Sequence, residues 1–392
     1  MQPLTTIIIA RNAEDTIERA VQSVMDGGRD WPILLVDDFS DDQTVKRAQE
    51  LAGEQVRVVR PDQHIGTGNA RQTGLDHVET DFAVWLDADD RAHPERMSLC
   101  LNALRATKAD MVIHSASLKD GKADNKIGKL SIPNFLMTPA GFSWQLERNY
   151  SPILCPAFKV NAARKVGFDR SLIACEDYDH FVSMLLMNAK ISFLKYDCLD
   201  VYAYAGSVSR NLDRHQAQLQ KIYQRHSPKQ ITGYLKQQSC IDGGISEAVH
   251  AFILASRAVY AQDYDQAALY ADKMDPEDMS VAVPYGRPFA VLKLYILGVC
   301  ALKRQDFLSA KRWFETCLVK EGFQADVMNN LGVSYAALGE ISEAERAFVN
   351  ALEIKPEYLD AQMNLKNVQA DQQKDWRITS HPLRFFKTRS VY

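Results

Sequence analysis

Short runs of aliphatic and β-branched residues recur along the first ninety positions, and polar segments with helical periodicity separate them. The runs cover 5–10, 33–36, 56–59 and 82–86. Each run has the length of a typical strand, while Ile17, Val21 and Val24 between the first two runs fall on one face of a helix. Strands that alternate with helices form a parallel sheet that is covered on both faces. The pattern therefore predicts a doubly wound α/β domain in the first half of the chain.

The pattern changes near residue 246, where small and large apolar residues begin to repeat at a fixed spacing. Gly298 and Gly332 lie 34 positions apart, and Phe314 and Phe348 repeat the same interval. The spacing and residue types resemble the tetratricopeptide pattern, in which helix pairs stack and three copies are the usual minimum for stability. The predicted repeats cover about 248–281, 291–324 and 325–358, and a capping helix follows them.

The two patterns divide the chain into four predicted parts. These are an α/β domain at 1–225, a helical linker with a hinge at 226–245, repeats with a capping helix at 246–375, and a basic aromatic tail at 376–392. A length of 392 residues also favours two domains, because one hydrophobic core rarely serves so long a chain. Three alternatives remain for the tail: binding to an anionic membrane surface, folding back on an acidic neighbour, and disorder.

Composition narrows the classes of protein further. The net charge of −4 gives no reason to expect nucleic-acid binding. The first residues lack the basic segment of a signal peptide, and no apolar run approaches the ~20 residues of a membrane span. The seven cysteines are scattered without the spacing of a zinc site, which suggests reduced thiols. We therefore expect a cytoplasmic protein, with peripheral contact to the inner membrane face as an open alternative.

Charged or polar residues follow three of the four predicted strands. They are Arg11 and Asn12 after the first strand, Asp37 and Asp38 after the second, and Asp87 and Asp89 after the fourth. Ligands of doubly wound sheets bind beyond the carboxyl ends of the strands, so we expect these groups at one edge. If extended backbone continues through Asp89, Asp87 and Asp89 point the same way, and their oxygens suit Mg²⁺ or Mn²⁺. A solvated turn is the alternative for the Asp cluster alone, but three charged strand ends together favour a binding site.

The order and spacing of these motifs resemble those of family 2 inverting glycosyltransferases, which have the GT-A fold. The resemblance covers roughly the first half of the chain and rests on 7–12, 36–42, 66–74 and 86–90. It implies a nucleotide-sugar donor, with a UDP-sugar favoured, that is bound by Ala10, Arg11, Asn12, Asp37, Asp38, Gly66, Arg71, Asp87, Ala88 and Asp89. It also implies a divalent cation, Mn²⁺ or Mg²⁺, held by Asp89 and Asp87. Arg71 would balance the charge of these carboxylates.

A second acidic pair, Glu176 and Asp177, follows a segment at 164–169 that resembles the family's approach to its ED motif. An inverting transfer needs a base that takes the proton of the acceptor. The resemblance assigns this role to Asp177, with Glu176 supporting it or contacting the acceptor. Helical spacing after the pair indicates that it also caps a helix, and a helix N-terminus favours an ionised carboxylate.

The remaining part of the first domain is less patterned. Polar residues with two glycines at 119–129 suggest a mobile loop. Aromatic residues within 133–156 form either a sugar-stacking surface or a small core patch, and we favour the patch. Ala203 and Ala205 stand where the family usually has Arg or His, and Arg210 or His215 could contact the diphosphate instead.

The sequence thus predicts a metal-dependent inverting glycosyltransferase joined to a tetratricopeptide module. A repeat array usually offers a groove to peptides, so we expect a protein or peptide acceptor. Synthesis of a surface polysaccharide or lipopolysaccharide is the alternative. A non-catalytic nucleotide-sugar-binding scaffold is the alternative from another class, and the intact Asp87, Asp89 and Asp177 argue against it. The array could also form a homodimer or brace the site.

Overall fold

The computed structural model describes residues 4–28, 31–138, 140–150, 155–204, 212–241, 243–370 and 376–383, without the side chains of 212–214. Its contacts divide the chain into two compact units. Unit 1 contains the chain up to Thr138 and from Asn149 to Ile222. Unit 2 contains Pro139 to Arg148 and the chain from Tyr223 to Ser390. The short segment from Pro139 to Arg148 thus leaves the α/β domain to which the sequence pattern assigned it.

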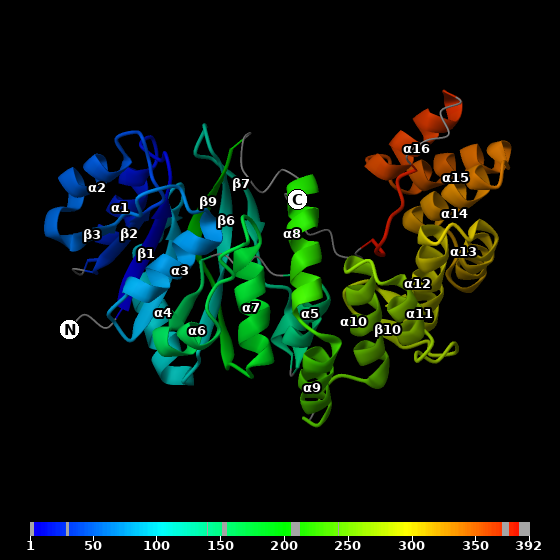
Figure 1. Cartoon of the computed structure of the whole chain (residues 1–392), viewed down its shortest axis with the longest axis horizontal. Helices are drawn as coiled ribbons and strands as arrows, with labels where there is room; N and C mark the ends of the chain where they lie inside the picture. Colours follow the sequence, from blue (N-terminus) through cyan, green and yellow to red (C-terminus); the bar gives the residue numbers. More distant parts are fainter. Residues whose placement is uncertain are drawn as a thin grey trace. The chain divides into compact units, whose positions relative to one another are not determined.

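Unit 1 begins with a parallel sheet of four strands in the order β3-β2-β1-β4 (Figure 1). The strands are β1 (Leu4–Ala10), β2 (Ile33–Asp37), β3 (Val56–Val59) and β4 (Phe82–Asp87). In β1, Ile9 pairs with Val36 on one side and with Asp87 on the other, so three strands end at the same edge. All of β2 is buried, as its unbroken apolar run predicts. The predicted parallel sheet is confirmed.

Further strands extend the sheet in mixed directions. They are β5 (Arg91–Ala92), β6 (Met111–Asp120), β7 (Lys126–Leu130), β8 (Ala157–Lys159) and β9 (Ile191–Ala203). Strand β8 is antiparallel to both β4 and β6, while β9 is parallel to β6.

The predicted mobile loop at 119–129 is wrong, because most of it belongs to a hairpin of β6 and β7. The Asp120 carboxylate accepts the backbone N–H groups of Lys122 and Ala123 at 2.9 and 2.8 Å. These bonds close the turn, so the polar residues that suggested mobility hold it in place.

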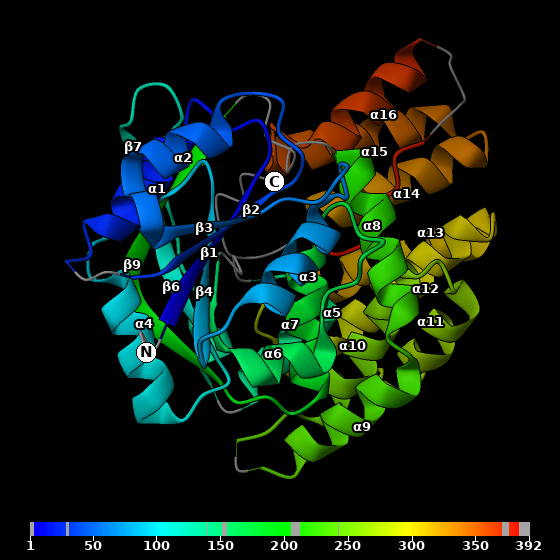
Figure 2. The same ribbon diagram turned by 60° about the vertical axis from the view of Figure 1, so that its left-hand side comes forward.

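The helices of unit 1 are α1 (Ile17–Met25), α2 (Thr44–Ala52), α3 (Thr67–His77), α4 (Arg96–Thr107), α6 (Val160–Val166) and α7 (Glu176–Leu186), with short 3-10 turns at Gly53–Gln55 and Asn134–Met137. Helix α8 (Leu212–Arg225) continues from unit 1 into unit 2. Helix α6 packs against both α3 and α7 (Figure 2). Helix α3 lies close to the sheet because Gly74 has no side chain: a Cβ there would come within 2.8 Å of Ile7.

Unit 2 begins with the segment that the chain inserts from unit 1. This segment forms a 3-10 turn (Gly141–Ser143) and the short helix α5 (Trp144–Glu147). The Trp144 ring lies 6.1 Å from the ring of Phe252, and the fully buried Glu147 accepts hydrogen bonds from Ser256 Oγ and Tyr285 Oη at 2.5 and 3.0 Å. The core-patch interpretation of the aromatic region therefore holds for Trp144.

Stacked helix pairs make up the rest of unit 2. The helices are α9 (Pro228–Ser239), α10 (Glu247–Tyr260), α11 (Tyr264–Ala271), α12 (Phe289–Lys303), α13 (Phe307–Glu321), α14 (Ala325–Ala337), α15 (Ile341–Ile354) and α16 (Leu359–Gln369). A small hairpin, β10 (Val281–Ala282) with β11 (Arg287–Pro288), precedes α12. A Cβ on Gly298 would lie 2.7 Å from the Phe314 ring, and one on Gly332 would lie 2.6 Å from the Phe348 ring. The 34-residue period therefore comes from helices that approach closely at these glycines.

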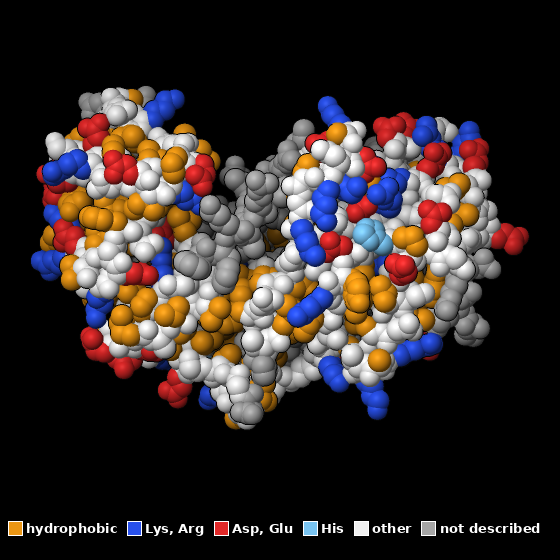
Figure 3. All heavy atoms as spheres, turned by 180° about the vertical axis from the view of Figure 1, so that it is seen from behind, with side chains coloured by type: hydrophobic (Ala, Val, Ile, Leu, Met, Phe, Trp, Pro, Cys, Tyr) orange, Lys and Arg blue, Asp and Glu red, His pale blue; other side chains and the backbone are white. Residues whose placement is uncertain are grey.

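Among the described residues, no helix combines the length and the apolar character needed to cross a bilayer. Acidic, basic and apolar side chains are interspersed on the face drawn in Figure 3, in keeping with the small net charge of −4. All seven cysteines are free thiols, as predicted.

Candidate active site

The end of β4 places a cluster of carboxylates at the edge where β1 and β2 also end. The strand stops at Asp87, and the Asp90 N–H donates to the Asp87 carbonyl at 3.1 Å, which makes a tight turn. The condition that extended backbone continues through Asp89 is therefore not met. The turn buries Asp90, which the sequence analysis did not assign, and leaves Asp87 and Asp89 partly exposed.

Arg71 connects this turn to the second acidic motif. Its guanidinium binds the Asp87 carboxylate at 3.1 Å and the Glu176 carboxylate at 2.8 Å. The Arg71 and Glu176 side chains are only 10% and 6% exposed, whereas Asp87 is 38% exposed. Solvent therefore reaches the ion-pair network at Asp87 but hardly at Glu176. The predicted pairing of Arg71 with Asp87 is present, and Glu176 is an additional partner that the sequence did not reveal.

Two carboxyl groups of the turn, those of Asp89 and Asp90, have raised pKa values and so hold protons more tightly than usual. Burial, together with the charge of Asp87, raises the pKa of Asp89 to about 6. Burial and the charges of Asp89 and Asp87 also raise the pKa of Asp90 well above its usual value. The pKa of Arg71 is also raised: burial opposes its charge, but the charges of Asp87 and Glu176 more than offset that effect. The cluster carries more negative charge than one arginine neutralises.

Asp177 lies in the first turn of α7, next to Glu176. Cys175 precedes the helix in the left-handed conformation, with φ of 61°, which turns the chain so that Glu176 and Asp177 begin the helix. Burial and the charge of Glu176 raise the pKa of Asp177 to about 7, although its oxygen accepts the Tyr178 N–H at 2.7 Å. A partly exposed carboxyl group with a pKa near neutrality is suited to accept a proton.

The two aspartates after β2 are directed toward the protein. The buried Asp38 carboxylate accepts the N–H groups of Ile65 and Gly66 at 2.7 and 3.0 Å, and its second oxygen lies 2.8 Å from His64 Nδ1. The fully buried Asp37 accepts from Ser40 Oγ. The two carboxylates thus fix the loops that line the edge, and their expected role in binding the donor remains a prediction.

The remaining predicted donor-binding residues lie around these loops. Arg11 and Asn12 are exposed just beyond β1, and Arg11 Nη1 lies 3.2 Å from His64 Nε2. Ala10 and Ala88 are buried and contribute backbone. Gly66 has a φ of 80°, which its lack of a side chain permits, and it precedes α3.

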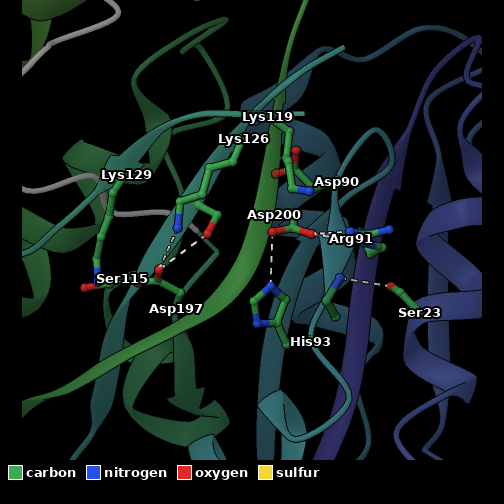
Figure 4. Close-up of polar contacts among 12 residues, drawn as sticks. Ser23, Asp90, Arg91, His93, Ser115, Lys119, Lys126, Lys129, Asp197 and Asp200 are labelled. Atoms are coloured by element: carbon green, nitrogen blue, oxygen red, sulfur yellow. Dashed lines mark hydrogen bonds and ion pairs between the residues drawn. The ribbon is translucent and has the colours of Figure 1, made fainter. Parts of the chain in front are cut away.

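A network on β5 and β9 braces the acidic turn from behind. Asp200 on β9 binds Arg91 at 2.5 Å and His93 at 3.1 Å, on either side of its carboxylate (Figure 4). The backbone N–H of Tyr202 donates to Asp90 at 3.1 Å, and the Arg19 guanidinium lies 3.7 Å from the centre of the Tyr202 ring. No local sequence signal pointed to Arg19, because the fold brings it in from α1.

The chemistry of the cluster suits a hard divalent cation. Asp87, Asp90 and Cys155 are the one group of three potential ligands found in the part of the chain that the structure describes, with ligand atoms within 4.8 Å of one another. Burial raises the pKa of the Cys155 thiol well above its usual value, so it stays protonated and is a poor ligand. The carboxylates of Asp87 and its neighbours supply the oxygen atoms that Mg²⁺ or Mn²⁺ prefers.

The two proposed substitutes for the missing family residues have different outcomes. His215 lies in α8, where its Nδ1 is 3.4 Å from Cys175 Sγ, just before the acidic pair. Ala205 and Arg210 lie outside the described residues.

The fold and this site define the class of protein. A parallel half-sheet brings charged strand ends to one edge, and a helix that begins with an acidic pair joins them through Arg71. This is the arrangement expected of the GT-A fold.

Comparisons with known proteins agree with that class. Residues 5–164 match the family model described as glycosyl transferase family 2, and residues 325–358 match a tetratricopeptide repeat model. The chain therefore contains a family 2 glycosyltransferase domain at its N-terminus and a tetratricopeptide repeat in its C-terminal part.

Similar proteins include a succinoglycan biosynthesis protein, ExoO, of Rhizobium meliloti, which is 25% identical over 221 residues that cover 53% of this chain and 63% of that protein. A chondroitin synthase of Escherichia coli is 26% identical over 192 residues, which cover 46% of this chain and 26% of that protein. The chain thus spans less than two thirds of the length of both relatives. The solved S. aureus TarS fragment 1–349, in complex with UDP-GlcNAc, is 15% identical with a TM-score of 0.49, covering 91% of this chain and 93% of that fragment.

Proposed function

We propose that the chain transfers a sugar from a nucleoside-diphosphate donor to an acceptor with inversion, and that Asp177 is the catalytic base. The observation that carries this proposal is the double ion pair of Arg71. It holds Asp87, at the strand end where donors bind, and Glu176, the neighbour of Asp177, in one site. Groups for binding the donor and for activating the acceptor are thereby fixed by one guanidinium.

The proposed reaction is a single displacement. The acceptor hydroxyl attacks the anomeric carbon, and its proton passes to the Asp177 carboxylate. The bond between that carbon and the diphosphate oxygen breaks, and the nucleoside diphosphate leaves with the electron pair. A base with a pKa of about 7 is substantially ionised at neutral pH and still binds a proton strongly enough to assist the attack.

A divalent cation would be held by Asp87 with Asp89 or Asp90, and when bound it would neutralise charge on the diphosphate. The chain's own contribution is to keep Asp87 oriented through Arg71 and to keep Asp90 in place through the Tyr202 N–H. The exposed Phe39 ring, with the Arg60 guanidinium 5.3 Å from its centre, offers an apolar surface at the donor edge on which a nucleobase could stack. We propose a UDP-sugar as the donor.

For the acceptor, we propose a growing glycan of a cell-surface polysaccharide. Both relatives are named for polysaccharide synthesis, of succinoglycan and of chondroitin, which supports this class of acceptor. The protein or peptide acceptor expected from the repeats stays a prediction, which the match to a tetratricopeptide repeat supports.

Donor binding can be tested without knowing the acceptor. UDP-, GDP- and CDP-sugars are added to the full chain with and without Mn²⁺, and thermal stabilisation is measured. A ligand present at 100 times its Kd stabilises the folded state by ~2.7 kcal/mol. We expect one nucleotide class to raise the unfolding temperature in a Mn²⁺-dependent way and to be hydrolysed slowly. If no nucleotide sugar shifts unfolding, or if the sugar is never released, the proposed function is wrong.

A further inference from the structure

The C-terminal segment 376–383, which forms no helix or strand and bends at His381, lies against the first helix of successive repeats. Its contacts come from α10, α12, α14 and α16, which are the first helices of the helix pairs and the capping helix. We call this surface, with its central residues Tyr295, Asn329, Asn330 and Asn364, the inner groove.

Two asparagines of the inner groove bind the backbone of the segment in the same way. Asn364 accepts the Arg377 N–H and donates to the Arg377 carbonyl, both at 2.8 Å. Asn330 accepts the Thr379 N–H and donates to the Thr379 carbonyl, both at 2.9 Å. Alternate residues of an extended chain face the same side, so the two asparagines bind residues i and i+2.

The two asparagines occupy equivalent positions of successive repeats, because they lie 34 residues apart. Asp326 and Asp360 have the same spacing: Asp326 accepts the Leu383 N–H at 2.7 Å, and Asp360 accepts from Thr379 Oγ1 at 3.0 Å. The contacts to the segment therefore follow the repeat itself and form a ladder along the groove.

The side chains that form the ladder are buried and polar, and contacts that only hold the segment in place do not require this. The asparagines at 329, 330 and 364 are all 0% exposed. If the segment left, their amides would lose buried hydrogen bonds, which costs free energy. Another extended backbone that formed the same hydrogen bonds would remove this cost. Apolar residues of the same volume would hold a permanent cap without this cost.

Side chains of the segment add selectivity to the backbone contacts. The Thr379 hydroxyl is enclosed by Tyr358, Asp360 and Asn329. The His381 ring stacks on Tyr260 with 3.4 Å between ring centres. The Arg377 side chain, by contrast, is 49% exposed and contributes little.

Repeat arrays of this kind commonly bind extended peptides on such a surface. We propose that the chain's own residues 376–383 act as an autoinhibitory segment that closes the inner groove to a partner polypeptide. A partner would present an extended segment with a threonine at the position of Thr379 and an aromatic or histidine side chain two residues later. The segment must leave before such a partner binds. This inference does not depend on the glycosyltransferase activity.

The test uses a labelled synthetic peptide with the sequence of residues 376–383 and the full-length chain. Thr379→Pro removes both the N–H that Asn330 accepts and the hydroxyl, so it should release the segment from the groove. The matched control is Arg377→Ala, which changes an exposed side chain of the same segment and leaves the backbone contacts intact. Peptide binding is measured by fluorescence anisotropy.

We expect the wild-type chain and Arg377→Ala to bind the peptide at least 10-fold more weakly than Thr379→Pro. A tethered segment competes at a millimolar effective concentration, so the difference reaches on the order of 100-fold for a micromolar peptide. Adding Asn330→Ala and Asn364→Ala to the Thr379→Pro chain should abolish binding. A peptide with proline in place of the threonine should not bind any variant.

If the Thr379→Pro chain is folded by circular dichroism and does not bind the peptide, the proposal is overturned and the segment is a fixed part of the array. If this variant does not fold, the milder His381→Ala is used, which removes the stacking on Tyr260 and should still increase peptide binding several-fold over Arg377→Ala. Equal binding by those two variants would likewise overturn the proposal.

Discussion

The raised pKa of Asp177 leads to a prediction about stability. The carboxyl group is partly buried beside Glu176, and its pKa rises from 3.8 to about 7. Each pKa unit corresponds to ~1.4 kcal/mol, so ionisation of Asp177 lowers the free energy of unfolding of unit 1 by up to ~4 kcal/mol at pH 8. An Asp whose pKa is higher in the folded than in the unfolded chain loses stability as the pH rises from about 4 to about 7.

Asp177→Asn removes this cost while keeping the shape of the side chain. The variant should therefore match the wild type in stability near pH 4 and exceed it increasingly up to pH 7. Above pH 7 the difference in stability should stay constant. For a unit of this size, ~4 kcal/mol corresponds to an increase in Tm on the order of 10 °C at pH 8, which is an upper limit. The gain in stability would come with a loss of transfer, as expected for a group placed for function.

The assay must report unit 1 alone, because two compact units can unfold separately. Limited proteolysis in a chelating buffer from pH 4 to 9 detects thermal unfolding, and peptides from β1 and β4 are quantified by mass spectrometry. Asp62→Asn is the matched control, since Asp62 is exposed and the same change there should alter stability by only ~0.5 kcal/mol at any pH. A pH-independent difference for Asp177→Asn, or a variant less stable than wild type at pH 8, would refute the reasoning.

Three further predictions concern the rest of the site. Arg71→Met should destabilise unit 1 by ~3 kcal/mol, which is the low end for a broken buried pair because Asp87 keeps part of its hydration. In a double-mutant cycle with Glu176→Gln, the two changes should be non-additive by ~1–3 kcal/mol. Strict additivity in the proteolysis assay would contradict the ion pair. Asp89→Ala should abolish Mn²⁺-dependent binding of a nucleoside diphosphate in calorimetry without unfolding the chain, and unchanged metal and nucleotide affinity would remove Asp89 from the metal site. Gly68→Ala should destabilise unit 1 by ~1–3 kcal/mol, because its Cβ would come within 2.4 Å of the Asp169 carbonyl, and a stability equal to wild type would show that the loop yields freely.

The sequence predicted those parts of the fold that periodicity determines. Parallel strands need unbroken apolar runs, so β1, β2 and β4 were located correctly. The repeats were located because Gly298 and Gly332 each leave room for a phenylalanine ring one helix later. Both features are local and repeat along the chain.

Features that depend on long-range contacts were not predictable in this way. The hairpin of β6 and β7 looked like a loop because its polar residues close a turn. The inserted helix α5 has no periodic signal, since its Glu147 is satisfied only by Ser256 and Tyr285 of a later helix and hairpin.

In the candidate site, too, some residues could be predicted from local motifs, whereas others depend on long-range contacts. Motif spacing identified Asp87, Arg71 and Asp177, and the structure brings the first two into direct contact. The importance of Asp90 was missed because it depends on where β4 ends and on the N–H of Tyr202 from a distant strand. Long-range hydrogen bonds of this kind leave no pattern in the local sequence.

The most direct test of the central claim is donor turnover by Asp177→Asn compared with wild type, with water as the acceptor. The nucleotide sugar identified by thermal stabilisation is supplied at saturation with Mn²⁺, its Kd is measured by calorimetry, and the anomeric configuration of the released sugar is followed by NMR. We predict that the variant binds the donor within ~3-fold of wild type, because Asp177 acts on the acceptor, and that its turnover falls by ~10²–10⁴. The wild type should release a sugar of inverted configuration. Undiminished turnover by the variant, or retained configuration in the wild-type product, would contradict the assignment of Asp177 as the base of an inverting transferase.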